Sequence, residues 1–207
     1  FEDLRVGQTI DLGPPGTFSQ DATHKHFGQA ISSLPQATIE QVFREVDAGA
    51  ADYGVVPIEN STEGAVTHTL DMFLDTPLAI CGEVELAVHQ QLLSKATNLA
   101  GVKQIYSHAQ SLAQCRRWLA GHLPGVACEA VSSNAEAARR GASEAGAAAI
   151  AGESAGRLYE LTRLAANIED EPGNTTRFLV IGRHETQPSG HDKTSLLLST
   201  GNRPGAL

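Results

Sequence analysis

Residues 53–64 read YGVVPIENSTEG, an apolar run that passes directly into a cluster of polar residues. The apolar part favours a buried strand, which we predict over residues 51–58. Residues 64–74 then place apolar side chains at helical spacing and favour a helix. In α/β sheets, ligands bind at the carboxyl ends of such strands. Asn60 and Glu63 could equally form a helix-capping pair. A cap needs only one such side chain and this run has several, so we favour a binding site.

Predicted strands and helices also alternate along the chain on both sides of this stretch. Strands are predicted at residues 8–12, 78–93, 104–107, 128–131, 147–151 and 176–181, and helices at residues 17–27, 39–48, 110–119, 134–142 and from 154 onward. This alternation favours an α/β fold with mostly parallel sheets.

The middle of the chain has a βαβ rhythm of its own, which favours a second lobe inserted into the first. We therefore expect a first lobe over residues 1–85, the inserted lobe over 86–170 and a return to the first lobe over 171–183. Residues 184–192 have the polar composition of a linker, and a new strand is expected to begin at Lys193.

Composition excludes several classes of function. The 207 residues are 41% hydrophobic and 19% charged, which is typical of a globular protein. The net charge of −9 and the absence of a long Lys/Arg run argue against nucleic acid as a partner. No apolar run is long enough to span a bilayer and no leader pattern is present, so the expectation is a cytoplasmic protein without a membrane partner. Its three scattered cysteines are expected to be reduced.

Three further segments carry polar groups suited to binding. The glycine-rich turn of residues 13–16 is followed by Thr17 at a helix start, where backbone N–H groups can bind an anion or simply form a capped turn. After a second strand come Ser107, Gln110 and Gln114, the last two one helical turn apart. His108 beside them could be an acid or base, although such a histidine is more often structural.

The third segment is residues 174–178, NTTRF, where donor-rich residues lead into an apolar strand. On a strand, Thr176 and Phe178 share one face while Arg177 points to the other face or into a bend. A surface arginine in a strand-forming run is an equally good interpretation of these residues alone. His24 and His26 have no third ligand nearby in the sequence, so we expect no metal site.

Taken together and in this order, the segments resemble prephenate dehydratases. The resemblance rests on residues 12–19 (LGPPGTFS), 54–61 (GVVPIENS), 107–110 (SHAQ) and 174–178 (NTTRF). The tail, residues 193–207, resembles the truncated start of the phenylalanine-sensing ACT domain that follows in this family. In many bacteria a chorismate mutase domain precedes the dehydratase, and residues 1–7 could be the remnant of a linker from one. Asp11 departs from the more apolar first strand usual in the family.

The resemblance implies a two-lobed fold like that of type II periplasmic binding proteins, with the active site in the cleft between the lobes. It implies a carbon–oxygen lyase that converts prephenate to phenylpyruvate in phenylalanine biosynthesis without a cofactor. It also implies a homodimer or homotetramer, with phenylalanine as the allosteric effector of the missing ACT domain.

The family pattern also implies roles for particular residues. Thr176 would hydrogen-bond or protonate the leaving hydroxyl, Arg177 would bind a carboxylate, and Glu59 would be a proton source or would orient its neighbours. The expected catalytic residues are Thr176, Glu59 and Asn60, and the expected substrate-binding residues are Thr17, Ser61, Thr62, Ser107, Gln110, Gln114, Asn174, Arg177 and Phe178.

Two other functions fit the same sequence. Arogenate dehydratase performs the same chemistry on an amino-bearing substrate. A non-enzymatic module that binds or senses a small anion could share the fold and the cleft, but it would not need the Thr176 segment beside Glu59 and Asn60.

Overall fold

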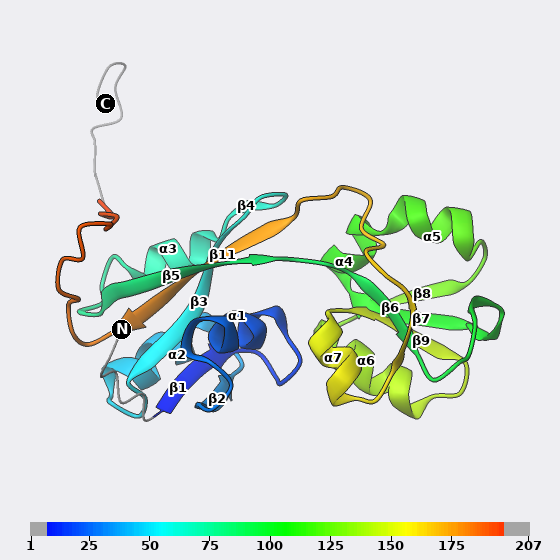
Figure 1. Cartoon of the computed structure of the whole chain (residues 1–207), viewed down its shortest axis with the longest axis horizontal. Coiled ribbons are helices and arrows are strands. Elements are labelled where there is room, and N and C mark those ends of the chain that lie inside the picture. The colour runs from blue at the N-terminus through cyan, green and yellow to red at the C-terminus, as the bar shows by residue number, and fades with distance from the viewer. Residues whose placement is uncertain (1–7, 197–207) are drawn as a thin grey trace, which may run out of the picture.

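Two mixed β-sheets, each covered by helices, form the two lobes of the computed structural model, which describes residues 8–196 (Figure 1). This arrangement confirms the expected two-lobed α/β fold. Within the described residues, no helix has the length and apolar character needed to cross a membrane.

The first lobe is built on a sheet of strand order β2-β1-β3-β11-β5, with the short strand β4 paired to β3. Its strands are β1 (Gln8–Leu12), β2 (Ser32–Gln36), β3 (Tyr53–Asn60), β4 (Gly64–Ala65), β5 (Ala79–Ala87) and β11 (Thr175–Gly182). Its helices are α1 (Phe18–Phe27), α2 (Ile39–Asp47) and α3 (Thr67–Met72).

Apolar residues on both faces of this sheet explain why helices cover both. Val56, Ile58 and Leu179 pack with α2 and α3 on one face, whereas Val55 and Phe178 pack under α1 on the other. Successive side chains along a strand point to opposite faces of the sheet, so the position of each residue decides which face it covers. Helix α2 begins with a capping box in which Thr38 and Gln41 satisfy each other's backbone N–H groups.

The second lobe is built on a sheet of strand order β10-β6-β9-β7-β8. Its strands are β6 (Gln91–Ser94), β7 (Gln104–His108), β8 (Ala127–Val131), β9 (Ala147–Ala151) and β10 (Thr162–Ala165). Its helices are the 3₁₀ helix η1 (Leu99–Gly101), α4 (Ala109–Gln114), α5 (Arg116–His122), α6 (Asn134–Ser143) and α7 (Glu153–Leu158). The small residues of β9 allow α6 to pack closely on the sheet, with Ala137 and Ala138 fully buried.

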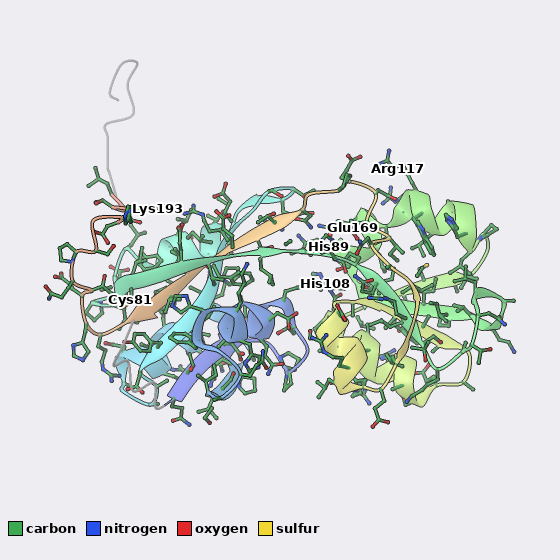
Figure 2. All side chains as sticks on the ribbon, in the orientation of Figure 1. Cys81, His89, His108, Arg117, Glu169 and Lys193 are labelled. Atoms are coloured by element: carbon green, nitrogen blue, oxygen red, sulfur yellow. The ribbon has the colours of Figure 1, made fainter. Side chains whose placement is uncertain are left out.

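The chain crosses between the lobes twice, between β5 and β6 and again between β10 and β11. The two crossings are tied together by Glu169, whose carboxylate accepts hydrogen bonds from the His89 ring and the Gln90 backbone, both at 2.9 Å. Figure 2 shows His89 and Glu169 together where these segments enter the second lobe. The expected boundaries at residues 85/86 and 170/171 stay predictions. The sheets place the crossings within residues 87–91 and 165–175.

Several details differ from the sequence-based predictions. The sheets are not mostly parallel, because the strands that lead into and out of the second lobe, β5, β11, β6 and β10, pair antiparallel with their neighbours. Strands β2 and β10 were not predicted, since the exposed and polar residues of both lack a clear apolar alternation. The predicted helix 110–119 is broken at Cys115 into α4 and α5.

The polar segment after β11 has no regular secondary structure over residues 184–196, including the first residues of the strand expected from Lys193. Lys193 forms an ion pair with Glu83 of β5, so this part of the chain lies against the first lobe. The rest of the expected strand and ACT start, and the expected linker remnant at residues 1–7, lie outside the described residues.

Asp11 is buried within the first lobe and does not face an anion site. Its carboxylate accepts a hydrogen bond from Ser33 Oγ at 2.7 Å on the neighbouring strand β2. Burial raises the pKa of Asp11, and the Ser33 hydrogen bond offsets part of that shift. Because the folded pKa lies above the unfolded value, the contribution of Asp11 to stability is complete below the unfolded pKa and is lost as pH rises through the folded pKa.

We expect Asp11→Asn to flatten this part of the pH dependence of the free energy of unfolding, because the asparagine side chain does not titrate. Its amide oxygen can still accept the hydrogen bond from Ser33. The free energy of unfolding of the variant should exceed that of the parent chain near neutral pH, and the difference should shrink toward the ordinary pKa of aspartate. Urea denaturation across this range measures the difference. A gap between the two proteins that widens as pH falls would contradict the assignment.

Candidate active site

A cavity of about 710 Å³ lies between the two lobes and is lined by residues of both. Six of the expected site residues line it: Thr17, Asn60, Gln110, Gln114, Asn174 and Thr176. They come from the start of α1, the ends of β3 and β11 and the helix α4, which are far apart in the sequence. The fold thus brings the four motif segments to one place.

A chain of side-chain hydrogen bonds runs along one wall of this cavity. Asn60 and Thr176 are direct neighbours on the adjacent strands β3 and β11. Asn60 Nδ2 donates to Thr176 Oγ1 and to Asn174 Oδ1, both at 2.8 Å. Asn174 Nδ2 then donates to Gln114 Oε1 at 3.3 Å, and Gln90 Nε2 donates to the same oxygen at 3.3 Å. The chain connects the first lobe, both crossings and the second lobe.

Backbone N–H groups fix which side-chain atoms donate and which accept in this series of hydrogen bonds. Asn60 Oδ1 accepts hydrogen bonds from the backbone N–H groups of Thr62 and Glu63, at 2.9 and 3.1 Å. Since a backbone N–H can only donate, the amide of Asn60 must present its NH₂ group to Thr176. Thr176 Oγ1 is therefore an acceptor in this contact, and within the described residues it donates to nothing. Its hydroxyl hydrogen remains available to a molecule in the cavity.

The second lobe contributes the start of α6 to the opposite side of the cavity. Ser107 is fully buried and does not line the cavity itself. Its hydroxyl lies 3.0 Å from Asn134 Oδ1, and the same oxygen accepts from the His108 backbone N–H at 3.0 Å. Asn134 does line the cavity, so Ser107 supports a lining residue. Figure 2 shows His108 at the edge of the second lobe that faces the first.

Charged groups on α6 also reach the cavity. Glu136 accepts two hydrogen bonds from Arg139, both at 2.7 Å, and one from Arg140 at 3.0 Å. These hydrogen bonds, with Arg139 as the larger cause, lower the pKa of Glu136 to about 2. Glu136 is thus an anion at neutral pH and is a poor source of protons. Among the described residues, no cluster of three His, Cys, Asp or Glu side chains could hold a metal ion.

The lobes also touch where α1 meets α7 (Figure 1). Ser154 Oγ donates to Asp21 Oδ2 at 2.8 Å across the interface. Phe18 lies so close to Gly152 that an added Cβ would be 3.0 Å from its ring. Burial raises the pKa of Asp21, and the Ser154 hydrogen bond partly offsets the shift. Phe18 and the neighbouring Thr17 both line the cavity, so we expect this contact to close it on the side of α1.

We expect Gly152→Val to force the lobes apart at this contact. The backbone of Gly152, with φ −70°, accepts a side chain, so the variant meets Phe18 without backbone strain. Misplacement of positioning groups by about 1 Å can reduce turnover roughly 100-fold, so we expect a loss of about tenfold or more in kcat/KM. Small-angle scattering should show a larger radius of gyration.

Gly121→Val is the matched control, because a Cβ at Gly121 meets nothing within 4 Å. It should leave both the kinetics and the scattering unchanged. If Gly152→Val behaved in the same way as the control, the contact between α1 and α7 would have no role in closing the cavity.

Arg177 and Glu59, both expected in the site, do not line this cavity. Arg177 donates to Glu59 at 2.9 Å and to Glu83 at 3.4 Å, which lie on the strands to either side of β11. It lines a different pocket, on the face of the sheet that α3 covers. The alternation of the strand turns Thr176 into the cavity and Arg177 away from it. Arg177 thus lies on the face of the sheet away from the cavity.

Four other expected binding residues also lie outside the cavity. Phe178 is only 2% exposed and packs under α1, so it belongs to the core. Ser61 Oγ accepts from the Thr175 backbone N–H at 3.0 Å and holds the strand ends together. Thr62 lines a smaller pocket on the other side of Gln114. Ser107 acts through Asn134, as described above.

Several lining residues were not singled out from the sequence. They are Gln90, Ser132, Asn134, Arg139 and Tyr159. Their sequence context is ordinary: Arg139 follows the i, i+3 pattern of a solvated helix face, and Tyr159 follows a short helix. Ser133 also lines the cavity and caps α6, since its hydroxyl accepts from the Glu136 backbone N–H at 3.0 Å.

A comparison with protein-family models matches residues 10–186 to the family described as prephenate dehydratase. The chain belongs to the prephenate dehydratase family. All four motif segments and the whole second lobe lie within the matched residues, as does the first lobe from the third residue of β1 onward.

Individual relatives agree with this membership. The chain is 59% identical over 197 residues to a bifunctional chorismate mutase/prephenate dehydratase of Pseudomonas aeruginosa, covering 95% of this chain and 54% of that protein. It is 37% identical over 210 residues to a prephenate dehydratase of Mycobacterium sp. (strain JLS), covering 95% of this chain and 67% of that protein. The chain thus spans about half the length of the bifunctional relatives.

Among solved structures, the prephenate dehydratase of Arthrobacter aurescens in complex with L-Phe superposes with a TM-score of 0.80 at 34% identity. The match covers 91% of this chain and 63% of that chain. The superposition includes most of both lobes, so members of this dehydratase family share the two-lobed arrangement seen here.

Proposed function

We propose that this chain catalyses the decarboxylating dehydration of prephenate to phenylpyruvate, a carbon–oxygen lyase reaction of phenylalanine biosynthesis. The observation that carries the proposal is the hydrogen-bond chain in the cavity, which leaves the Thr176 hydroxyl hydrogen available to a molecule that binds there. Membership of the prephenate dehydratase family supports the same reaction.

The reaction defines what the cavity must do. The bond between the ring and its carboxylate breaks and releases CO₂, and its electron pair enters the ring as the ring hydroxyl departs from the opposite carbon. One proton is taken up, so that the hydroxyl leaves as water. Aromatisation supplies the driving force, and the enzyme has to hold the dianion in a reactive pose and stabilise the departing oxygen.

Thr176 suits the departing oxygen. A threonine hydroxyl is too weak an acid to supply the proton itself, so we assign it a hydrogen bond to the leaving oxygen, which strengthens as negative charge develops there. Asn60 holds Thr176 in this role by occupying its acceptor side. Glu59 forms an ion pair with Arg177 and does not line the cavity, so we assign it no proton transfer to the substrate.

Neutral donors around Thr176 would position the substrate. Gln110 and Gln114 project from α4 into the cavity, and Thr17 lies at the start of α1 on the side of the other lobe. Closure of the lobes over the substrate would exclude water from the developing charge and make each hydrogen bond more effective. We propose this arrangement without a cofactor.

The test is to incubate the chain separately with prephenate and with arogenate. Formation of phenylpyruvate from prephenate supports the proposal. Formation of phenylalanine from arogenate alone would instead favour arogenate dehydratase, the nearest alternative. Binding of prephenate, measured by calorimetry, without either product would favour the non-enzymatic binding module.

Further properties of the whole protein are proposals that rest on the family. We propose phenylalanine as an effector that acts through an ACT domain, with support from the L-Phe complex of the Arthrobacter aurescens relative. We also propose a cytoplasmic homodimer or homotetramer. Gel filtration with light scattering would measure the assembly, and calorimetry with phenylalanine would measure the binding.

A further inference from the structure

The cavity must hold a substrate with two carboxylates inside a chain of net charge −9. The long-range field of such a chain repels an anion, so a local cation is needed. Among the described residues that line the cavity, Arg139 of α6 is the one arginine or lysine. The other arginine expected to serve, Arg177, is held by two carboxylates outside the cavity.

Arg139 can exchange its present partner for a substrate carboxylate. It forms a bidentate pair with Glu136 in which the Arg139 side chain is 59% exposed, and exposed pairs of this kind contribute little to stability. Glu136 keeps a second partner in Arg140, with Nε of Arg140 at 3.0 Å. If Arg139 turns to the substrate, Glu136 therefore does not become an unpaired anion. The guanidinium fork of Arg139 matches a carboxylate in the same bidentate way.

Arg139 also has a suitable neighbour for this purpose. Tyr159, which follows α7, lines the same cavity. The part of the lining that the second lobe supplies therefore combines a cation, Arg139, with the neutral hydroxyl donors Tyr159 and Ser132. The Thr176 wall of the cavity offers only neutral donors from Asn60, Asn174 and Gln114.

The reaction determines which carboxylate belongs at Arg139. The ring carboxylate loses its charge as CO₂ departs, so a strong ion pair to it would stabilise the ground state more than the transition state and slow the reaction. The pyruvyl carboxylate keeps its charge throughout. We infer that Arg139 is a positioning residue that binds the pyruvyl carboxylate and leaves the ring carboxylate to the uncharged part of the cavity. This inference rests on the proposed function.

The experiment compares Arg139→Gln with the unsubstituted chain in two measurements. The first is KM and kcat for prephenate. The second is the inhibition constant of phenylpyruvate, the product, which retains only the pyruvyl carboxylate. We expect Arg139→Gln to raise both KM and this inhibition constant roughly tenfold or more, with a smaller effect on kcat, because loss of a charged hydrogen-bonded partner weakens binding. Arg139→Lys should recover part of the loss.

The matched control is Arg44→Gln, which removes an exposed arginine of α2 whose ion pair with Glu45 lies outside the cavity. It changes the net charge equally and should alter neither constant. Thermal denaturation of each variant separates a folding defect from a binding defect, since a merely structural role would lower Tm without the matched rise in both constants.

Each other outcome decides a specific point. If KM for prephenate rises while the inhibition constant of phenylpyruvate stays the same, Arg139 binds the ring carboxylate and the inference is overturned. If neither constant changes, Arg139 binds no carboxylate. If the unsubstituted chain forms no phenylpyruvate from prephenate, the proposed function itself fails, and this result is distinct from the other two.

Discussion

Thr176→Val is expected to reduce kcat for prephenate roughly 100- to 1,000-fold, as does the loss of a single preorganised donor to a developing oxyanion in other enzymes. Valine has nearly the shape of threonine, and Thr176 is only 9% exposed, so the site should stay closed. The variant lacks the hydroxyl hydrogen that, in the present structure, has no acceptor among the described residues. KM should change much less than kcat, because the hydrogen bond strengthens mainly as the hydroxyl leaves.

Steady-state kinetics with phenylpyruvate detection measure this effect, and Thr176→Ser is the control that keeps the hydroxyl. Serine should retain far more activity than valine, with some loss because its side chain is less restrained. Equal activity of the valine and threonine proteins would remove Thr176 from the mechanism. A loss that appears only in KM would make it a binding residue.

Asn60→Asp has the second large expected effect, about 100-fold or more in kcat, because it reverses the direction of one hydrogen bond. The retained carboxylate oxygen can still accept from the Thr62 and Glu63 backbone N–H groups. The other oxygen replaces the NH₂ group that donates to Thr176 and to Asn174, so Asn174 Oδ1 loses this donor as well. Thr176 would then donate its hydrogen to the new carboxylate and have none to offer to the substrate.

Two comparisons test this explanation. Asn98→Asp makes the same chemical change at the cap of η1, where the asparagine oxygen accepts from the Gly101 backbone N–H, and should leave kcat unchanged. The double variant with Thr176→Val should be little worse than either single variant, since both remove the same hydrogen bond. Additive losses would show that Asn60 and Thr176 act independently.

The sequence predicted much of the local structure, because local patterns encode it. The apolar run of residues 51–58 indicated the core strand β3, and the 3.6-residue apolar pattern of residues 39–48 indicated α2. The failures have local causes too. β2 has exposed residues and a proline, and α4 and α5 are separate helices although their apolar stripe is continuous. Antiparallel pairing at the crossings could not be predicted, since it depends on how the chain returns from the second lobe.

For the site, motif order in the sequence was sufficient to group Asn60, Gln114, Asn174 and Thr176, which the fold joins by hydrogen bonds. It was not sufficient to separate Thr176 from Arg177. Adjacent residues on a strand face opposite sides, and only the position of β11 in its sheet tells which side is the cavity.

The sequence by itself determined the family, the α/β class and the segments that meet in the cleft, because these follow from the order of residues along the chain. Only the tertiary structure decided which side chains face the substrate and in which direction their hydrogen bonds run. Those facts depend on partners more than 50 residues away, such as Asn60 with Thr176 and Asp21 with Ser154. They also depend on the helix α6, whose arginine reaches the cavity only once the second lobe has folded against the first.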